Sequence, residues 1–177
     1  MDLGAPGSMT CPIAQYGPFL VAGKAAVWDA CSNSCGGTAR ECKLAMAMAM
    51  IETTLMNVTQ RDWTKDSTTD GSANVSLWNL SIDLITSLGF AGVTWTLNTQ
   101  THEALAAAAC LVVKGVHTWG PRVFLNFVRG GRTAFVDGWS YGAYDFRNAV
   151  ATVLGAFAKD PALLTDGRRV ECSMPHV

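Results

Sequence analysis

An uncharged, apolar stretch of the chain predicts a helix at the centre of the fold. Between Lys43 and Glu52 no residue is charged, so a helix here has no polar face and should be enclosed by other elements. Just before it, Thr38-Ala-Arg-Glu41 has the form of a capping box, in which the Thr hydroxyl and the Glu carboxylate satisfy free amides at a helix start. We therefore expect a buried helix from Ala39 to about Met56.

Hydrophobic repeats at three and four residues, with Gly or Pro at several ends, predict further helices. They run from about Val75 to Leu88, from about His102 to Lys114, from Gly120-Pro121 to Gly130-Gly131, and from Tyr144 to Phe157. Thr59 to Gly71 is polar and predicts a loop or short hairpin. The fold class that follows is mainly α (α+β), with a central buried helix and a small irregular or β portion.

Length and charge limit the possible classes of protein. A chain of 177 residues with 49% apolar content can bury one core, so residues 11–177 are expected to form a single domain behind a flexible or tag-like N-terminus at 1–10. Its apolar runs, such as Leu44 to Ile51, are far shorter than the roughly 20 residues of a membrane span. A pI near 6.3 and the absence of a basic run argue against nucleic-acid binding.

The six cysteines indicate that the protein folds in an oxidising compartment. Their even number, spread along the chain, predicts three disulfides and a secreted, extracellular protein. Sequons at Asn57, Asn74 and Asn79 agree with secretion. The cluster Cys31-x3-Cys35-x6-Cys42 lacks both a His and the close pairs typical of zinc ligands, so we expect no metal and no cofactor.

Two kinds of carboxyl group could carry chemistry. Glu52 falls on the buried face of the central helix, where desolvation raises a carboxyl pKa, although a Glu there can also be structural, held by a hydrogen bond or an Arg. Asp62, Asp66 and Asp70 lie in a polar segment, where a carboxylate stays ionised; Asp70 is better explained as a turn residue. A glycosidase needs one protonated and one ionised carboxyl group.

Two further segments are informative together: Met50-Ile-Glu52-Thr-Thr and Lys65-Asp66-Ser-Thr-Thr-Asp70-Gly-Ser-Ala-Asn74-Val-Ser-Leu-Trp78. They resemble glycoside hydrolase family 134, whose members are inverting endo-β-1,4-mannanases of lysozyme-like fold. The sequence Leu125-Asn126-Phe-Val-Arg129-Gly-Gly-Arg132 is similar to a later segment of the family. The resemblance implies Glu52 as general acid and Asp66 as general base, with Asp62 as the alternative base.

The expected function is therefore a secreted, monomeric, disulfide-stapled catalytic domain that hydrolyses β-1,4-mannan or mannooligosaccharides. Candidate substrate-binding residues are Trp63, Lys65, Asn74, Asn126 and Arg129, of which Trp63 could stack on a sugar face. A net charge of −1 favours a neutral glycan over anionic cell wall or cationic chitosan. The alternatives are a muramidase or chitosanase, a non-catalytic glycan-binding effector, and a cysteine peptidase using a free Cys with His117.

Overall fold

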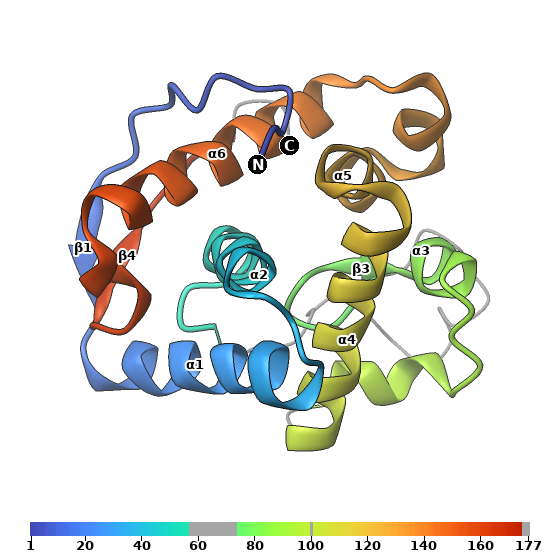
Figure 1. Ribbon diagram of the computed structural model, residues 1–177, viewed down its shortest axis with the longest axis horizontal. Helices are drawn as coiled ribbons and strands as arrows, with labels where there is room; N and C mark the ends of the chain where they lie inside the picture. Colours follow the sequence, from blue (N-terminus) through green and yellow to red (C-terminus); the bar gives the residue numbers. More distant parts are fainter. Residues whose placement is uncertain (57–73, 100, 175–177) are drawn as a thin grey trace.

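The computed structural model describes residues 1–56, 74–99 and 101–174. Its elements are β1 (Ile13–Gln15), α1 (Pro18–Asp29), the π-helical turn η1 (Ala30–Ser34), α2 (Ala39–Glu52), β2 (Asn74–Val75), β3 (Leu80–Ser81), α3 (Ile82–Ser87), the 3-10 helix η3 (Thr94–Asn98), α4 (His102–Trp119), α5 (Pro121–Asp137), α6 (Tyr141–Lys159), the 3-10 helix η4 (Pro161–Leu164) and β4 (Arg168–Val170). Helix α2 stands in the middle, between α1 on one side and α6 on the other (Figure 1). Small antiparallel sheets pair β1 with β4 and β2 with β3. The mainly α class with a small β portion is confirmed.

The central helix begins where the sequence predicts it. The Thr38 side chain accepts from the Glu41 amide at 3.2 Å, and Glu41 Oε1 accepts from the Thr38 amide at 2.9 Å. The other oxygen, Glu41 Oε2, lies 2.5 Å from Nε2 of His117 near the end of α4. Every residue from Leu44 to Ile51 is buried, as expected for a helix without a polar face. The helix ends at Glu52, earlier than predicted, because Thr53 adopts an extended conformation.

The predicted helix from Val75 to Leu88 is wrong in its first half. Residues 74–81 form the β2–β3 hairpin, in which Ser76 and Asn79 take positive φ angles of 70° and 58°. Such angles belong to turns and interrupt a helix. The helix starts only behind Ser81, whose hydroxyl accepts from the Leu84 amide at 3.1 Å, so Ser81 and not Asn74 is the N-cap.

The helices of the second half are longer than predicted. Helix α4 continues to Trp119, and α6 starts at Tyr141 behind the N-cap Ser140. Helix α5 starts at Pro121 and is broken at Gly131, where φ is 69° and ψ is −164°. That conformation is open to glycine and strained for other residues, so the predicted stop is a kink after which the chain turns helical again.

The N-terminal residues lie against α6, whereas the sequence predicted a flexible N-terminus. Leu3 is buried, and Arg147 of α6 donates from Nη1 to the carbonyls of Leu3 and Gly4 at 2.9 and 2.7 Å. The Ser8 amide donates to Asn148 Oδ1 at 3.0 Å. Farther along, β1 pairs with β4 and so brings the two ends of the chain together (Figure 1).

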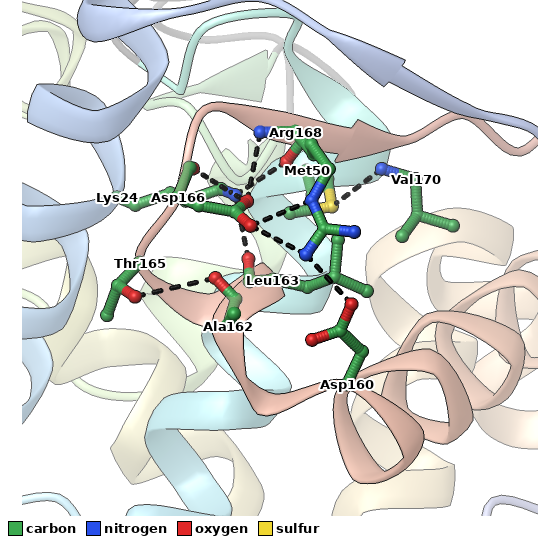
Figure 2. Close-up of polar contacts among 9 residues, drawn as sticks. All are labelled: Lys24, Met50, Asp160, Ala162, Leu163, Thr165, Asp166, Arg168 and Val170. Atoms are coloured by element: carbon green, nitrogen blue, oxygen red, sulfur yellow. Dashed lines mark hydrogen bonds and ion pairs between the residues drawn. The ribbon is translucent and has the colours of Figure 1, made fainter.

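A buried ammonium group joins α1 to the C-terminal segment. Lys24 Nζ donates to the carbonyls of Leu163, Asp166 and Arg168 at 2.7, 2.7 and 2.6 Å, and it lies 3.6 Å from the Asp166 carboxylate (Figure 2). Arg168 in turn contacts the carboxylates of Asp166 and Asp160. The charge of Lys24 is fully buried but has partners in several directions, as a buried charge requires.

Two disulfides are present, where the sequence predicted three. They join Cys11 to Cys172 and Cys35 to Cys110. The remaining two cysteines, Cys31 and Cys42, are buried free thiols. Within the described ranges, no helix has both the length and the apolar character to cross a membrane.

Candidate functional site

Glu52 lies at the C-terminal end of the central helix, with its side chain only 7% exposed. The preceding residues of α2, from Leu44 to Ile51, are apolar and buried, so the Glu52 side chain at the end of the helix is also largely buried. Thr53 then ends the helix: its amide and its hydroxyl both donate to the carbonyl of Ala49, each at 2.9 Å. A carboxyl group is therefore held in a largely apolar environment at a fixed helix end.

Arg169 of β4 fixes this helix end from the other side. Its guanidinium donates to the Met50 carbonyl at 2.7 and 3.1 Å and to the Thr53 carbonyl at 3.3 Å. A cation at a helix C-terminus interacts favourably with the helix dipole and satisfies carbonyls that have no partner within the helix. Sequence patterns do not indicate this role, because Arg169 is 119 positions from Met50.

Arg129 of α5 faces the carboxyl group. Its Nη1 lies 3.3 Å from Glu52 Oε1, and its side chain is 15% exposed. The guanidinium stands 5.4 Å from the ring centre of Phe146, and Nη2 contacts the sulfur of Met174 at 3.6 Å. Packing on both sides thus holds the positive charge beside Glu52.

The ion pair leaves hydrogen-bonding capacity unused. Among the described residues, neither Glu52 Oε1 nor Arg129 Nε has a hydrogen-bond partner, although both atoms are buried. The Glu52–Arg129 contact is therefore a charge pair without good hydrogen-bond geometry. An acceptor and a donor without hydrogen-bond partners thus lie close together, and both are enclosed by protein atoms.

Burial raises the pKa of Glu52 above its ordinary value, because desolvation penalises the carboxylate. The positive charge of Arg129 acts in the opposite direction and lowers the pKa, but by less. Glu52 therefore holds its proton to a higher pH than an exposed Glu. This is the property required of a general acid.

The other predicted catalytic residue cannot be placed. Asp66 lies outside the described residues, as do the alternative base Asp62 and the candidate sugar contacts Trp63 and Lys65. The structure brings together Glu52 and Arg129 from the predicted set.

Asn126 and Asn74 occupy different environments. Asn126 is 2% exposed on α5, and its Nδ2 donates to the Gly138 carbonyl at 3.3 Å, which ties the segment after the Gly131 kink back to the first half of the helix. Its Oδ1 has no partner among the described residues. Asn74 is half-buried in β2, opposite Ser81. The side-chain contact of Asn126 is structural, and Asn74 stays a predicted sugar contact.

Two hollows are found among the described residues, and Glu52 lines neither of them. One, of about 380 Å³, is mainly apolar and lies between α1 and the start of α4, with Phe19, Trp78 and Leu97 in its walls. The other, of about 680 Å³, is shallow and more polar, and is lined by Asp145, Glu171 and Met174. The second hollow borders the candidate site through Met174, which also contacts Arg129.

The free thiols are poor nucleophiles. Burial raises the pKa of both Cys31 and Cys42, so at neutral pH each is a protonated thiol and not a reactive thiolate. His117 pairs with Glu41 instead. These contacts do not support the cysteine peptidase alternative.

Comparison with protein-family models and with curated proteins found no match to this chain.

Proposed function

We propose that the chain is a secreted endo-β-1,4-mannanase of lysozyme-like architecture, with Glu52 as its general acid. The observation that carries the proposal is a carboxyl group, 7% exposed and with a raised pKa, at the end of the central helix. A glycosidase must keep such a group protonated so that it can protonate the leaving oxygen. The substrate class comes from the sequence resemblance to family 134.

In the proposed mechanism Glu52 donates its proton to the glycosidic oxygen while a carboxylate opposite it activates a water molecule. Asp66 is the proposed base, on the strength of the resemblance alone, and Asp62 is the alternative. Water then attacks the anomeric carbon from the face opposite the leaving group, so a β-linked chain releases the α-anomer first. This inverting geometry needs the two carboxyl groups about 6.5 to 9.5 Å apart.

Arg129 has two parts in this proposal. Its charge orients the Glu52 carboxyl group at 3.3 Å and limits how far the pKa rises. Its Nε is buried and has no partner among the described residues, so a sugar hydroxyl would reach it only by displacing the groups that cover it. Arg129 is thus proposed as a positioning and substrate-binding residue.

The substrate is tested by incubating the protein with β-1,4-mannan, chitosan and peptidoglycan and measuring reducing-sugar release. We expect release from mannan alone. Release from chitosan or peptidoglycan would instead identify one of the other lysozyme-like hydrolases. Mannan binding without release would identify a glycan-binding effector.

The role of Glu52 is tested by Glu52→Gln. The amide keeps the shape and polarity of the carboxyl group but has no acidic proton, so we expect turnover to be abolished while folding and oligosaccharide binding persist. The matched control is Glu103→Gln in the exposed first turn of α4, which should retain wild-type activity. A Glu52→Gln variant that keeps more than about a tenth of the wild-type rate would contradict the proposal, because removing a general acid typically costs about 10²-fold or more.

A further inference from the structure

The two free cysteines are neighbours in the fold. Cys31 lies in η1, at the end of the first helical segment, and Cys42 lies in the first turns of α2. Both side chains are completely buried. Helices that are separate in sequence thus enclose two sulfur atoms in one apolar space.

Gly37 shows how closely the two sulfurs approach the same point. A Cβ atom placed on Gly37 would lie 2.8 Å from Cys31 Sγ and 3.1 Å from Cys42 Sγ. The Gly37 amide also donates to the Cys31 carbonyl at 2.9 Å, which holds the loop over the pair. A side chain at this position would collide with the sulfurs, so glycine is needed for them to meet. Each of the two thiols also affects the pKa of the other, as expected for neighbouring groups.

We propose that Cys31 and Cys42 are an oxidation site that closes into a third disulfide. In this reaction both S–H bonds break and one S–S bond forms. A small-molecule disulfide such as oxidised glutathione takes up the two electrons and two protons and leaves as two thiols. The other four cysteines are already paired, so the oxidised chain has no other partner for either sulfur.

The new bond would complete a crosslinked junction of three helical elements. Cys35 at the end of η1 is already joined to Cys110 of α4, and the Cys31–Cys42 bond would join η1 to α2. The attacking species in disulfide formation is the thiolate. Because both thiols are buried in the folded protein, we place this oxidation during folding, before α2 is enclosed.

The protein offers a direct test, because Arg40 separates the two cysteines. The full chain is refolded from the reduced state in a mixture of reduced and oxidised glutathione. Remaining thiols are then alkylated in denaturant, and the protein is digested with trypsin and analysed by mass spectrometry without reduction. Cleavage after Arg40 and Lys43 yields the tripeptide 41–43, which contains Cys42, and cleavage after Lys24 yields peptide 25–40, which contains Cys31 and Cys35.

We expect tripeptide 41–43 only in a species that also contains peptide 25–40, and as a separate peptide only after reduction. In the control Cys42→Ser, Cys31 should be recovered alkylated. The Cys11–Cys172 and Cys35–Cys110 links in the same digest report correct folding. Free, alkylated 41–43 from protein in which these two links are complete would overturn the proposal. Attachment of 41–43 to any other cysteine peptide would overturn it equally.

Discussion

At the scale of single residues, Glu52 is subject to two opposing effects. Burial raises its pKa by destabilising the carboxylate, and Arg129 lowers it by stabilising that charge. Burial has the larger effect, and the 3.3 Å ion pair adds no hydrogen bond that would stabilise the carboxylate further. A Glu beside an Arg usually has a lowered pKa, so the burial of this pair reverses the usual direction of the shift.

This balance predicts how stability depends on pH. The pKa of Glu52 in the folded protein is raised above the unfolded value of 4.5. Its contribution to stability is therefore fully present below about pH 4.5 and is lost as pH rises through the folded pKa. Over this pH range the wild type should lose stability relative to Glu52→Gln. The loss is about 1.4 kcal/mol for each pH unit by which the pKa of Glu52 in the folded protein exceeds its pKa in the unfolded chain.

The measurement is the free energy of unfolding in guanidinium chloride, determined from acid to neutral pH for both proteins. Comparing the two cancels titrations that they share. The control Glu103→Gln alters an exposed residue, so its difference from wild type should remain small across this window. A pH-independent difference between wild type and Glu52→Gln, or one of opposite sign, would contradict the raised pKa.

At the scale of elements, charged side chains hold helix ends and strands together across the fold. Arg169 of β4 binds the last carbonyls of α2, and Lys24 of α1 binds three carbonyls around η4 and β4. Both use backbone acceptors, whose positions are set by the elements themselves. The end of α2 that carries Glu52 is consequently fixed by the C-terminal strand.

Removing the ammonium of Lys24 should loosen this junction. Lys24→Met keeps most of the side-chain length but leaves the carbonyls of Leu163, Asp166 and Arg168 without this donor. Each unsatisfied buried acceptor costs about 1 to 3 kcal/mol, so we expect a loss of roughly 3 kcal/mol or more in the free energy of unfolding. Guanidinium chloride unfolding measures it, with the exposed Lys43→Met as control. A loss below about 0.5 kcal/mol for Lys24→Met would show that the hydrogen bonds of Lys24 do not contribute to stability as proposed.

At the scale of the whole molecule, the two ends of the chain are held together twice. Strands β1 and β4 pair in antiparallel register, from Ile13 opposite Val170 to Gln15 opposite Arg168. Beside them the Cys11–Cys172 disulfide spans 161 positions, whereas Cys35–Cys110 spans 75. The long link closes almost the entire chain into a loop.

Loop length predicts the relative effect of the two disulfides. Replacing Cys11 and Cys172 by Ser should cost about 2 to 5 kcal/mol, because the unfolded chain regains the freedom that the crosslink removed. The same change at Cys35 and Cys110 should cost less by about 0.6 kcal/mol, the expected effect of one doubling in loop length. Thermal unfolding of the two double variants in parallel gives the comparison. An unchanged melting temperature for the Cys11/Cys172 variant would contradict the first expectation.

The sequence by itself determined the features that depend on near neighbours. The capping box at Thr38 and the proline at the start of α5 are local signals, read within one helical turn, and both were predicted correctly. The burial of α2 followed from its uncharged composition, and with it the environment of Glu52. Helix α1 was missed because glycine, proline and serine are frequent in the first 37 residues. The β2–β3 hairpin was missed because apolar spacing alone does not reveal a turn with positive φ angles.

The tertiary structure decided everything that joins distant parts of the chain. Arg129 was recognised from sequence only as a candidate sugar contact, and its ion pair with Glu52 depends on how α5 packs against the end of α2. Arg169 was not recognised at all, since its carbonyl partners lie more than 100 positions away. The physical reason is that a local pattern fixes an element's conformation and its buried face, while the partner of that face is chosen by the fit of the complete set of elements.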